Sequence, residues 1–482
     1  MATTGSVSSG TGLISGTDYS TLISKLMSVE EQPLTTLKSK ISVYEVKLSA
    51  YGTLKSNITS LQTAVENLTS STDGFNQLTA TSGNSSLVSV STDSTATQGT
   101  YDIKVNSLAQ QQKLKSTTFG TSEAVGAGTL HLTIGEDEVD VTVSSTDTIN
   151  DVADAINAAG LGVTATVIND GTNDVLTLKA NDTGTANTMT ITVTDSDGDN
   201  TDDSGLSRLY YEGDTGGQMT QTQEAKDASI TLDGVTITRS SNTIDDALTG
   251  VTITVKAASV DSSSETTITV GPDTSSVQSD INAFVTAYNN LLSYISTEQS
   301  YTAASGSTSA SAGTLLGDTT TNMIRDRLSS FIRDAVGGVS GFRHLSDLGI
   351  TVDTDGQLEV DSDTLSAALS DHFDSVKSFF TQSASSTASE GFASRMADTI
   401  DSWVDDTDGT VTTKTEGLQT TIDKLNDQAD AMQTRLDSVE ERYTAQFNAL
   451  ETLLATYQTT SSAVDSLIAA MDNLNTQIAN NK

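Results

Sequence analysis

Apolar residues recur at heptad spacing in two segments, residues 18–70 and 418–480, one near each end of the chain. The steps alternate between three and four residues, which gives a stripe narrower than the core face of a globular helix and is typical of coiled-coil helices. The first stripe contains Leu34, Leu37, Ile41, Tyr44, Leu48, Tyr51, Leu54, Ile58, Leu61, Val65 and Leu68. The second contains Ile422, Leu425, Ala429, Met432, Leu436, Val439, Tyr443, Phe447, Leu450, Leu454, Tyr457, Val464, Leu467, Met471, Leu474 and Ile478. We predict that the two segments form long helices that pair.

We predict that residues from both stripes form an interface that pairs the terminal helices into a leg and joins copies of the chain. They are Leu34, Leu37, Ile41, Leu48, Ile422, Leu425, Met432, Leu436, Val439, Tyr443, Leu450, Leu454, Leu467 and Met471. A long helix with so narrow a stripe is only marginally stable until it packs. We therefore expect both terminal segments to be disordered or frayed in the free protein and to become ordered on assembly.

Start and stop signals divide the N-terminal region into three parts. Residues 1–17 are rich in Gly, Ser and Thr, and we expect them to be disordered in isolation. Thr17-Asp18 can cap a first helix that runs to Glu31, and Pro33 restarts a long helix that extends to about Thr69. Asp73-Gly74 then ends that helix.

The period of the apolar residues changes to two from Phe75 onward, which is typical of strands. Residues 129–143 alternate on both sides of a turn at 135–137 and predict a hairpin. Residues 148–159 carry Ile149, Val152 and Ile156 on one face of a short helix. Further alternating segments predict strands at 163–167, 175–178, 189–193, 228–238 and 251–270.

Helical spacing returns at residues 275–298, and helices are also predicted at 319–335, 362–381 and 390–404. A Ser/Ala/Thr/Gly-rich linker covers residues 300–313. Asp353-Thr354-Asp355-Gly356 forms the turn of a hairpin between Ile350-Val352 and Leu358-Val360.

These elements predict an α+β multidomain fold, with coiled-coil-type terminal helices forming a stalk and β-rich head domains inserted between them. We expect a leg domain made of an arm and terminal helix, residues 1–42, together with residues 430–482. A helical stalk domain would contain residues 43–77 and 275–429. A β-rich head domain would contain residues 78–115 and 226–274, and an outer α+β head domain residues 116–225.

The charge of the chain is strongly acidic and unevenly distributed. Of its 482 residues, 63 are Asp or Glu and 24 are Lys or Arg, which gives a formal net charge of −39. Acidic residues are concentrated in the middle of the chain, whereas residues 1–70 carry as many basic as acidic residues. Because an acidic head repels phosphate groups, we expect neither nucleic acid nor a membrane as a partner.

Several classes of protein are disfavoured by what the sequence lacks. It has no Cys, so disulfide and thiol chemistry are impossible. It has no apolar run of 18 residues, and residues 1–20 lack the basic and apolar regions of a signal peptide. If the protein is secreted, it leaves by a route that does not require a cleavable signal peptide.

Enzymatic chemistry has little support in the sequence. The three histidines, His131, His344 and His372, do not have the spacing of metal ligands, and no nucleophile elbow, P-loop or dinucleotide fingerprint is present. The chain has a single Trp, Trp403, so no aromatic platform for a sugar is evident. We predict no catalytic residues and no cofactor.

One acidic segment resembles a calcium-binding loop in part. Asp195, Asp197 and Asp199 occupy the first, third and fifth positions of such a loop and are candidate ligands. Glycine falls at the fourth position instead of the sixth, and Leu206 occupies the twelfth position, where a bidentate Glu is required. We favour the interpretation of a solvated turn.

An ordered set of motifs across almost the whole chain resembles one family, the bacterial flagellar filament cap proteins, also called hook-associated protein 2. No single motif is specific, but together they follow the order of the family. The motifs are Gly12-Leu13-Ile14-Ser15-Gly16-Thr17-Asp18, Leu22-Ile23-Ser24-Lys25-Leu26-Met27, Glu31-Gln32-Pro33-Leu34, Leu48-Ser49-Ala50-Tyr51-Gly52-Thr53-Leu54-Lys55-Ser56, Leu232-Asp233-Gly234-Val235, Ser241-Asn242-Thr243-Ile244, Gly250-Val251-Thr252, Phe284-Val285-Thr286-Ala287-Tyr288-Asn289, Leu348-Gly349-Ile350-Thr351 and Asp355-Gly356-Gln357-Leu358. Residues 148–178 are similar to a small module shared by flagellins and hook-associated proteins.

The resemblance implies a non-enzymatic protein that forms a small ring-shaped homo-oligomer at the distal tip of the extracellular flagellum. Paired terminal helices would form legs, and the β domains a plate beneath which flagellin is inserted. The implied partners are flagellin, the hook–filament junction proteins and an export chaperone on the C-terminal helix. Export would use the flagellar type III apparatus.

Two alternatives remain open at this point. The chain could be another flagellar axial protein, such as a hook–filament junction subunit or a flagellin-like subunit. It could also be a secreted acidic adhesin, although such a protein does not require heptads at both ends. Some caps also adhere to mucus, and no adhesive pocket is evident in this sequence.

Overall fold

The computed structural model describes residues 18–213, 217–260, 265–305, 309–339, 341–383 and 389–480. The N-terminal arm expected at residues 1–17 lies outside this part of the chain. The chain divides into two compact units, one drawn from residues 1–69 and 278–482 and the other from residues 70–277. We call them the helical unit and the β-rich unit. The expected α+β multidomain fold is confirmed.

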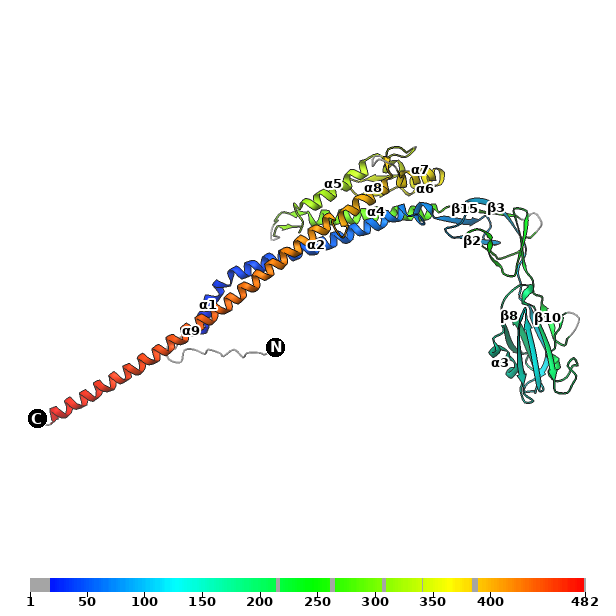
Figure 1. The fold of residues 1–482 in the computed structure, drawn as a ribbon, viewed down its shortest axis with the longest axis horizontal. Helices are drawn as coiled ribbons and strands as arrows, with labels where there is room; N and C mark the ends of the chain where they lie inside the picture. Colours follow the sequence, from blue (N-terminus) through cyan, green and yellow to red (C-terminus); the bar gives the residue numbers. More distant parts are fainter. Residues whose placement is uncertain are drawn as a thin grey trace. The chain divides into compact units, whose positions relative to one another are not determined.

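Three helices form the long axis of the helical unit: α1 (Tyr19–Glu30), α2 (Gln32–Thr69) and α9 (Thr410–Asn480). Asp18 caps α1 by accepting a hydrogen bond from the Thr21 backbone N–H at 3.1 Å. Pro33 lies in the first turn of α2, where its missing N–H costs nothing. Helices α2 and α9 lie side by side and run antiparallel, as Figure 1 shows in blue and orange.

Shorter elements complete the helical unit. Its other helices are α4 (Thr274–Glu298), which belongs to this unit from Gln278 onward, α5 (Thr319–Arg333), α6 (Ser362–Asp371), α7 (Phe373–Thr381) and α8 (Phe392–Val404). A 3-10 helix, η5 (Leu345–Leu348), precedes the predicted hairpin, which is formed by β18 (Ile350–Val352) and β19 (Leu358–Val360). The expected linker 300–313 contains a short strand pair, β16 (Tyr301–Thr302) and β17 (Ser311–Ala312).

The helix predicted at 362–381 is wrong as a single element. The chain breaks at His372, where φ is −139° and ψ is 37°, so α6 ends and α7 begins there. The break allows Phe379 and Phe380 of α7 to reach Phe392 of α8, with ring centroids 5.8 and 5.9 Å apart. Phe284 of α4 joins them at 5.6 Å from Phe392, which makes an aromatic core for this part of the unit.

One part of the β-rich unit is built from two antiparallel sheets. A five-stranded sheet has the order β1 (Leu78–Ser82), β15 (Thr266–Pro272), β3 (Gly99–Ser107), β11 (Ala228–Leu232) and β12 (Val235–Arg239). A three-stranded sheet has the order β13 (Thr243–Leu248), β14 (Val251–Val255) and β2 (Val88–Thr92). Alternating residues of both sheets, including Ile103, Ile230 and Ile253, form one hydrophobic cluster.

The remaining part of the β-rich unit combines two sheets and one helix. A four-stranded sheet has the order β10 (Thr220–Gln223), β4 (Lys113–Gly120), β8 (Asn173–Ala180) and β7 (Val163–Asn169). A three-stranded sheet has the order β6 (Asp137–Val143), β5 (Gly128–Ile134) and β9 (Met189–Asp195), and β5 with β6 forms the hairpin that the sequence predicts. Helix α3 (Ile149–Ala159) begins with a Thr148–Asp151 capping box and ends at Gly160, whose φ of +70° favours glycine.

Candidate assembly surface

The seam between α2 and α9 brings most of the predicted interface residues together. Leu34, Ile41, Leu436 and Val439 are buried, with exposed fractions of 3–7%. Ile422 is a buried member of the same hydrophobic cluster. The partly buried interface residues that pack against this cluster are Leu37, Leu48, Leu425, Met432 and Tyr443. Within a single chain, these residues therefore form an antiparallel pairing of the two ends.

An aromatic pair closes this seam at its far end. The ring of Tyr19, the first residue of α1, stacks on Phe447 of α9 with 5.0 Å between the centroids and 26° between the planes. Asp18 accepts hydrogen bonds from the side chains of Thr21 and Ser20, and these bonds hold its pKa at about 2. The α1 cap is consequently an ionised carboxylate throughout the physiological pH range.

Beyond Phe447, α9 continues to Asn480 with its apolar stripe uncovered. Leu450 is 41% exposed, and Leu467 and Met471 are 64% and 60% exposed. Every residue from 456 to 480 is exposed. The exposed apolar residues are Leu450, Leu453, Tyr457, Val464, Leu467, Ile468, Met471, Leu474 and Ile478. Of the predicted interface, Leu450, Leu454, Leu467 and Met471 thus lie outside the intrachain seam, which leaves an open surface.

Sequence reasoning missed two members of this open surface. Leu453 and Ile468 stand next to the predicted positions Leu454 and Leu467, and both are more than half exposed. A pair of adjacent apolar residues in a heptad stripe was the available signal, because it widens the stripe beyond a two-helix seam. The open part of α9 therefore has a wider apolar stripe than a two-helix seam requires.

A network of polar side chains lies at the end of the seam opposite to Tyr19 and Phe447. The Tyr51 hydroxyl of α2 donates to Asp318 at 2.6 Å, and Asp318 caps α5 by accepting from the Thr320 and Thr321 backbone N–H groups. Lys414 of α9 lies 3.7 Å from the same carboxylate. Despite burial, these donors and Lys414 lower the pKa of Asp318, while desolvation and the hydrogen bond to Asp318 raise the pKa of Tyr51.

Tyr51 belongs to the predicted apolar stripe, and the stripe gives no sign of this hydrogen bond. The signal for Asp318 was its position directly before Thr319-Thr320-Thr321, a typical helix start. A sequence pattern could not pair Asp318 with Tyr51, because they are separated by 267 residues. The network ties three helices together where the two-helix seam meets the rest of the helical unit.

The predicted calcium candidates are engaged by backbone groups of their own loop. The Asp195 carboxylate is buried and accepts from the Leu206 and Ser207 N–H groups at 2.8 and 3.1 Å. Asp197 accepts from the Asp199 N–H, and Asp199 from the Thr201 N–H. Within the described ranges, no group of three His, Asp or Glu side chains is arranged to hold a metal ion. These contacts give no support to a calcium site, which the positions of Gly198 and Leu206 already disfavour.

The histidines lie in separate structural settings. His131 on β5 has its two ring nitrogens 2.5 Å from Asp140 and 3.0 Å from Thr194, on the neighbouring strands β6 and β9. His344 caps η5, and His372 separates α6 from α7. These positions account for each histidine as a structural residue. Among the described helices, none is both long and apolar enough to cross a membrane.

Comparison with known proteins identifies the family. The model described as flagellar hook-associated protein 2 N-terminus matches residues 15–112, and the C-terminus model of the same family matches residues 225–459. A flagellin hook IN motif matches residues 129–182, which include β6, α3, β7 and β8.

Similar whole proteins agree with these matches. The chain is 34% identical to flagellar hook-associated protein 2 of Escherichia coli strain K12, across 86% of this chain and 88% of the relative. It is 32% identical to the B-type flagellar hook-associated protein 2 of Pseudomonas aeruginosa, with the same coverage of each chain. A crystal structure of the D1-D2-D3 domains of the flagellar cap protein FliD from Escherichia coli is 32% identical, with a TM-score of 0.54, and covers 77% of this chain and 99% of that chain. The chain therefore belongs to the flagellar hook-associated protein 2 family.

Proposed function

We propose that this protein caps the flagellar filament at its distal tip, where it promotes the insertion and polymerisation of exported flagellin and prevents its loss. It acts as a small ring-shaped homo-oligomer and catalyses no covalent step. The observation that carries this proposal is the open stripe of α9. A helix that continues past its intrachain partner with a row of exposed leucines has an apolar surface that water does not stabilise, so it requires other chains.

The dimensions of α9 suit a leg that reaches into a filament. The helix has 71 residues, which corresponds to roughly 100 Å at 1.5 Å per residue. Its buried half pairs with α1 and α2, and its open half is available to flagellin or to hook–filament junction proteins. Before export, the same open half is a suitable binding site for a chaperone.

The two units support a division of labour that refines the domain prediction. The leg would contain residues 1–42 and 430–482, and the stalk residues 43–77 and 275–429. The head would contain residues 78–115 and 226–274, with the outer domain at 116–225. Separate hydrophobic clusters in the two parts of the β-rich unit support an outer domain, and this domain should begin with β4 instead of residue 116, because Leu114 of β4 belongs to the outer cluster. We infer that the protein is extracellular, that its export needs no cleavable signal peptide, and that it has no nucleic acid or membrane partner.

Deletion of the gene tests this function. Electron microscopy should show missing or short filaments, and immunoblotting should find unpolymerised flagellin in the medium. Complementation with the wild-type gene should restore the filaments. Normal filaments in the deletion strain would contradict the capping role and would favour a secreted adhesin instead.

A further inference from the structure

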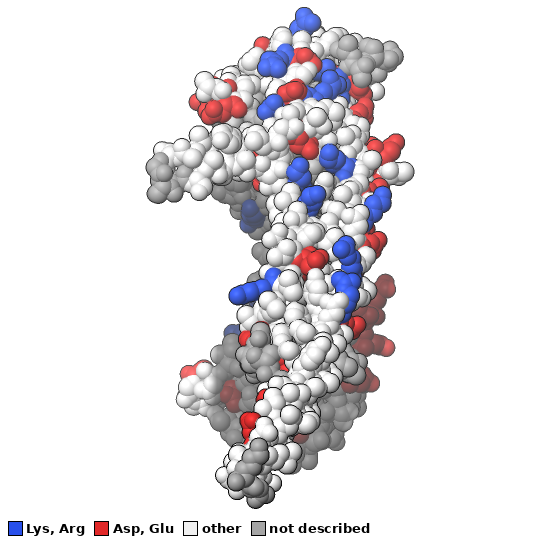
Figure 2. Space-filling view, turned by 90° about the vertical axis from the view of Figure 1, so that its left-hand side faces the viewer, with Lys and Arg blue, Asp and Glu red and all other residues white. Residues whose placement is uncertain are grey.

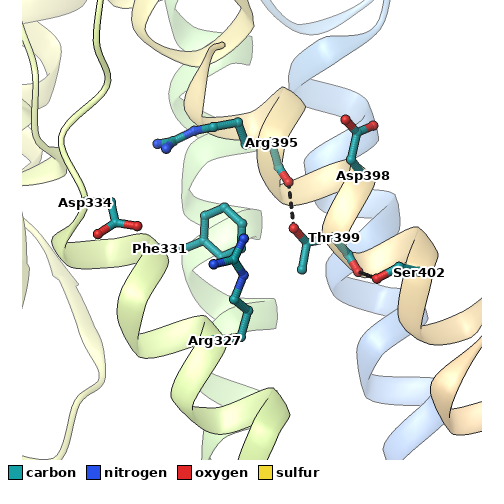
Figure 3. A pocket seen from close by; sticks show the side chains of 7 residues that line it. All are labelled: Arg327, Phe331, Asp334, Arg395, Asp398, Thr399 and Ser402. Carbon is teal, nitrogen blue, oxygen red and sulfur yellow. Dashed lines mark hydrogen bonds between the residues drawn. The ribbon is translucent and has the colours of Figure 1, made fainter. Parts of the chain in front are cut away.

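Two arginines on neighbouring helices border a pocket of about 310 Å³ in the helical unit. Figure 3 shows Arg327 and Phe331 on α5 and Arg395 on α8, around the same opening. The Arg327 guanidinium lies 4.7 Å from the centroid of the Phe331 ring, and the Arg395 guanidinium lies 5.9 Å from it. One aromatic ring thus supports two cationic groups.

The hydrogen-bonding state of Arg395 is unusual for this protein. Its Nε and Nη2 atoms are buried, and neither has a hydrogen-bond partner among the described residues. By contrast, Arg208 donates to Glu123 at 2.7 Å, and Arg239 donates to Asp246 at 2.9 Å. Asp334 and Glu390 act on Arg395 only through space, and burial lowers the pKa of its guanidinium.

The two free donors point to a particular ligand chemistry. Nε and Nη2 form the side edge of the guanidinium, which matches the two oxygens of a carboxylate in a bidentate pair. A buried donor without an acceptor is destabilising, so an apolar side chain of similar length would favour the isolated fold. The unpaired edge of Arg395 therefore favours an acceptor that arrives from outside the chain.

The surroundings favour a carboxylate carried by a protein over a free anion. Asp334 and Asp398 also line the pocket and balance the charge of its two arginines, so a free anion gains little long-range attraction there and a carboxylate held in place by other contacts is favoured. On the face drawn in Figure 2, uncharged residues cover most of the surface and basic side chains are interspersed with acidic ones. The face drawn there thus shows no broad basic patch that would attract a charged partner from a distance.

We propose that the pocket between α5 and α8 binds an Asp or Glu side chain of a second copy of this chain, held between Arg327 and Arg395. The chain has 63 Asp and Glu residues against 24 Lys and Arg, so a second copy offers many carboxylates to such a pocket. This inference rests on the proposed function, in which copies of the chain lie side by side in a ring. It adds a contact in the helical unit to the open stripe of α9.

Self-association of the full-length protein tests the pocket directly. Sedimentation equilibrium should show that Arg395→Met and Arg327→Met each weaken self-association, by about tenfold or more, because they remove one member of a desolvated charge pair. Arg395→Lys should weaken it as well, since an ammonium group lacks the bidentate edge. Arg333→Met is the matched control, because Arg333 is exposed on α5 outside the pocket, and it should associate like the wild type.

Thermal unfolding of the dilute monomer gives a second, independent result. Arg395→Met should raise the melting temperature by a few degrees, because it removes the unpaired buried donors. A lower melting temperature would overturn the proposal, since it would mean that Arg395 already has a stabilising partner within its own chain. Arg327 is exposed, so Arg327→Met tests association without changing a buried side chain.

The two hypotheses fail in different ways. If the wild type associates and the Arg327 and Arg395 variants associate equally well, the pocket does not hold a carboxylate of a second copy, while the cap function stands. If the gene deletion leaves normal filaments, the cap function fails whatever the pocket variants do. Weaker association with a stable monomer in both pocket variants, and not in Arg333→Met, is the result that supports the proposal.

Discussion

Tyr19 and Phe447 stack at a centroid distance of 5.0 Å, although they lie near opposite ends of the sequence. The pair marks the position where α9 loses its intrachain partner. On one side of it, the apolar stripe of α9 is packed against α1 and α2; on the other side, the stripe is exposed to solvent. The same helix therefore serves first as part of a fold and then as an assembly surface.

Removing the aromatic pair should loosen α1. In Phe447→Ala, we expect a loss of about 0.5–1.5 kcal/mol of pair energy in addition to lost burial, so α1 should open more often. Hydrogen exchange of residues 19–30 measures this opening. Tyr457→Ala is the matched control, because Tyr457 is 65% exposed on the same helix. Unchanged exchange in α1 of the Phe447 variant would contradict the assignment of this pair as the end of the seam.

The free protein should show a graded protection along α9. Residues 456–480 are exposed and lack packing partners among the described residues, so their amides should exchange rapidly before assembly. The segment around Leu436 and Val439 should exchange more slowly, because both side chains are buried. Strong protection of residues 456–480 in the monomer would contradict the expectation that this end becomes ordered on assembly.

Acidic substitutions on α9 should separate folding from assembly. Leu436 is 3% exposed and Leu450 is 41% exposed, so Leu436→Asp should destabilise the seam, whereas Leu450→Asp should change monomer stability by less than about 0.5 kcal/mol. Both variants should stop assembly and leave the β-rich unit folded. Circular dichroism measures the folding of the β-rich unit, and sedimentation measures assembly. Loss of the β-type signal in either variant, or normal assembly of Leu450→Asp, would contradict this prediction.

The Tyr51–Asp318 bond should make the helical unit sensitive to acid. Because the folded-state pKa of Asp318 is lowered, its contribution to stability is present above the unfolded-state pKa and is lost as the pH falls through the folded-state value. Tyr51→Phe should cost about 1.5–3 kcal/mol near neutral pH, as expected for a hydrogen bond to a charged group. Denaturant unfolding at pH 7 and pH 3 measures both effects.

The difference in unfolding free energy between the wild type and Tyr51→Phe should be smaller at pH 3 than at pH 7. Tyr44→Phe is a suitable control, because Tyr44 lies on the same helix and packs against the seam without being part of the Asp318 network. An equal loss of stability at both pH values would show that the bond does not depend on the charge of Asp318.

The acidic loop should behave as a structural element independent of calcium. Asp195→Ala leaves the Leu206 and Ser207 N–H groups without their acceptor, so we expect a loss of about 1–3 kcal/mol in the β-rich unit. Asp197→Ala, on the exposed part of the loop, should have little effect. Melting curves with calcium chloride or with EDTA should coincide for the wild type. A rise in melting temperature with calcium that Asp197→Ala abolishes would support a metal site.

The helical framework could be predicted from sequence because its cause is local. Heptad spacing predicts α2 and α9, and the alternation at 129–143 predicts the β5–β6 hairpin with its turn after Ile134. Spacing reports which face of a helix is apolar, but not which partner covers that face. The stripes therefore gave no indication that Leu436 is packed within the chain while Leu467 is not.

Contacts between distant residues set the limit of sequence reasoning. The break at His372 depends on how Phe379 and Phe380 pack against Phe392, and no helix-breaking residue marks it. The unpaired donors of Arg395 likewise depend on the position of α5 beside α8. Tertiary packing overrode the local pattern in the first case, and it created a candidate site without a motif in the second.

The central claim is that this protein caps filaments through the open stripe of α9. The most direct measurement adds purified protein to cells that lack the gene and quantifies flagellin in the medium. The wild type should reduce shed flagellin and restore filaments, while a Leu467→Asp/Met471→Asp variant, which remains folded because both positions are exposed, should do neither. Shed flagellin that stays unchanged after adding the wild type, or full rescue by the variant, would contradict the account.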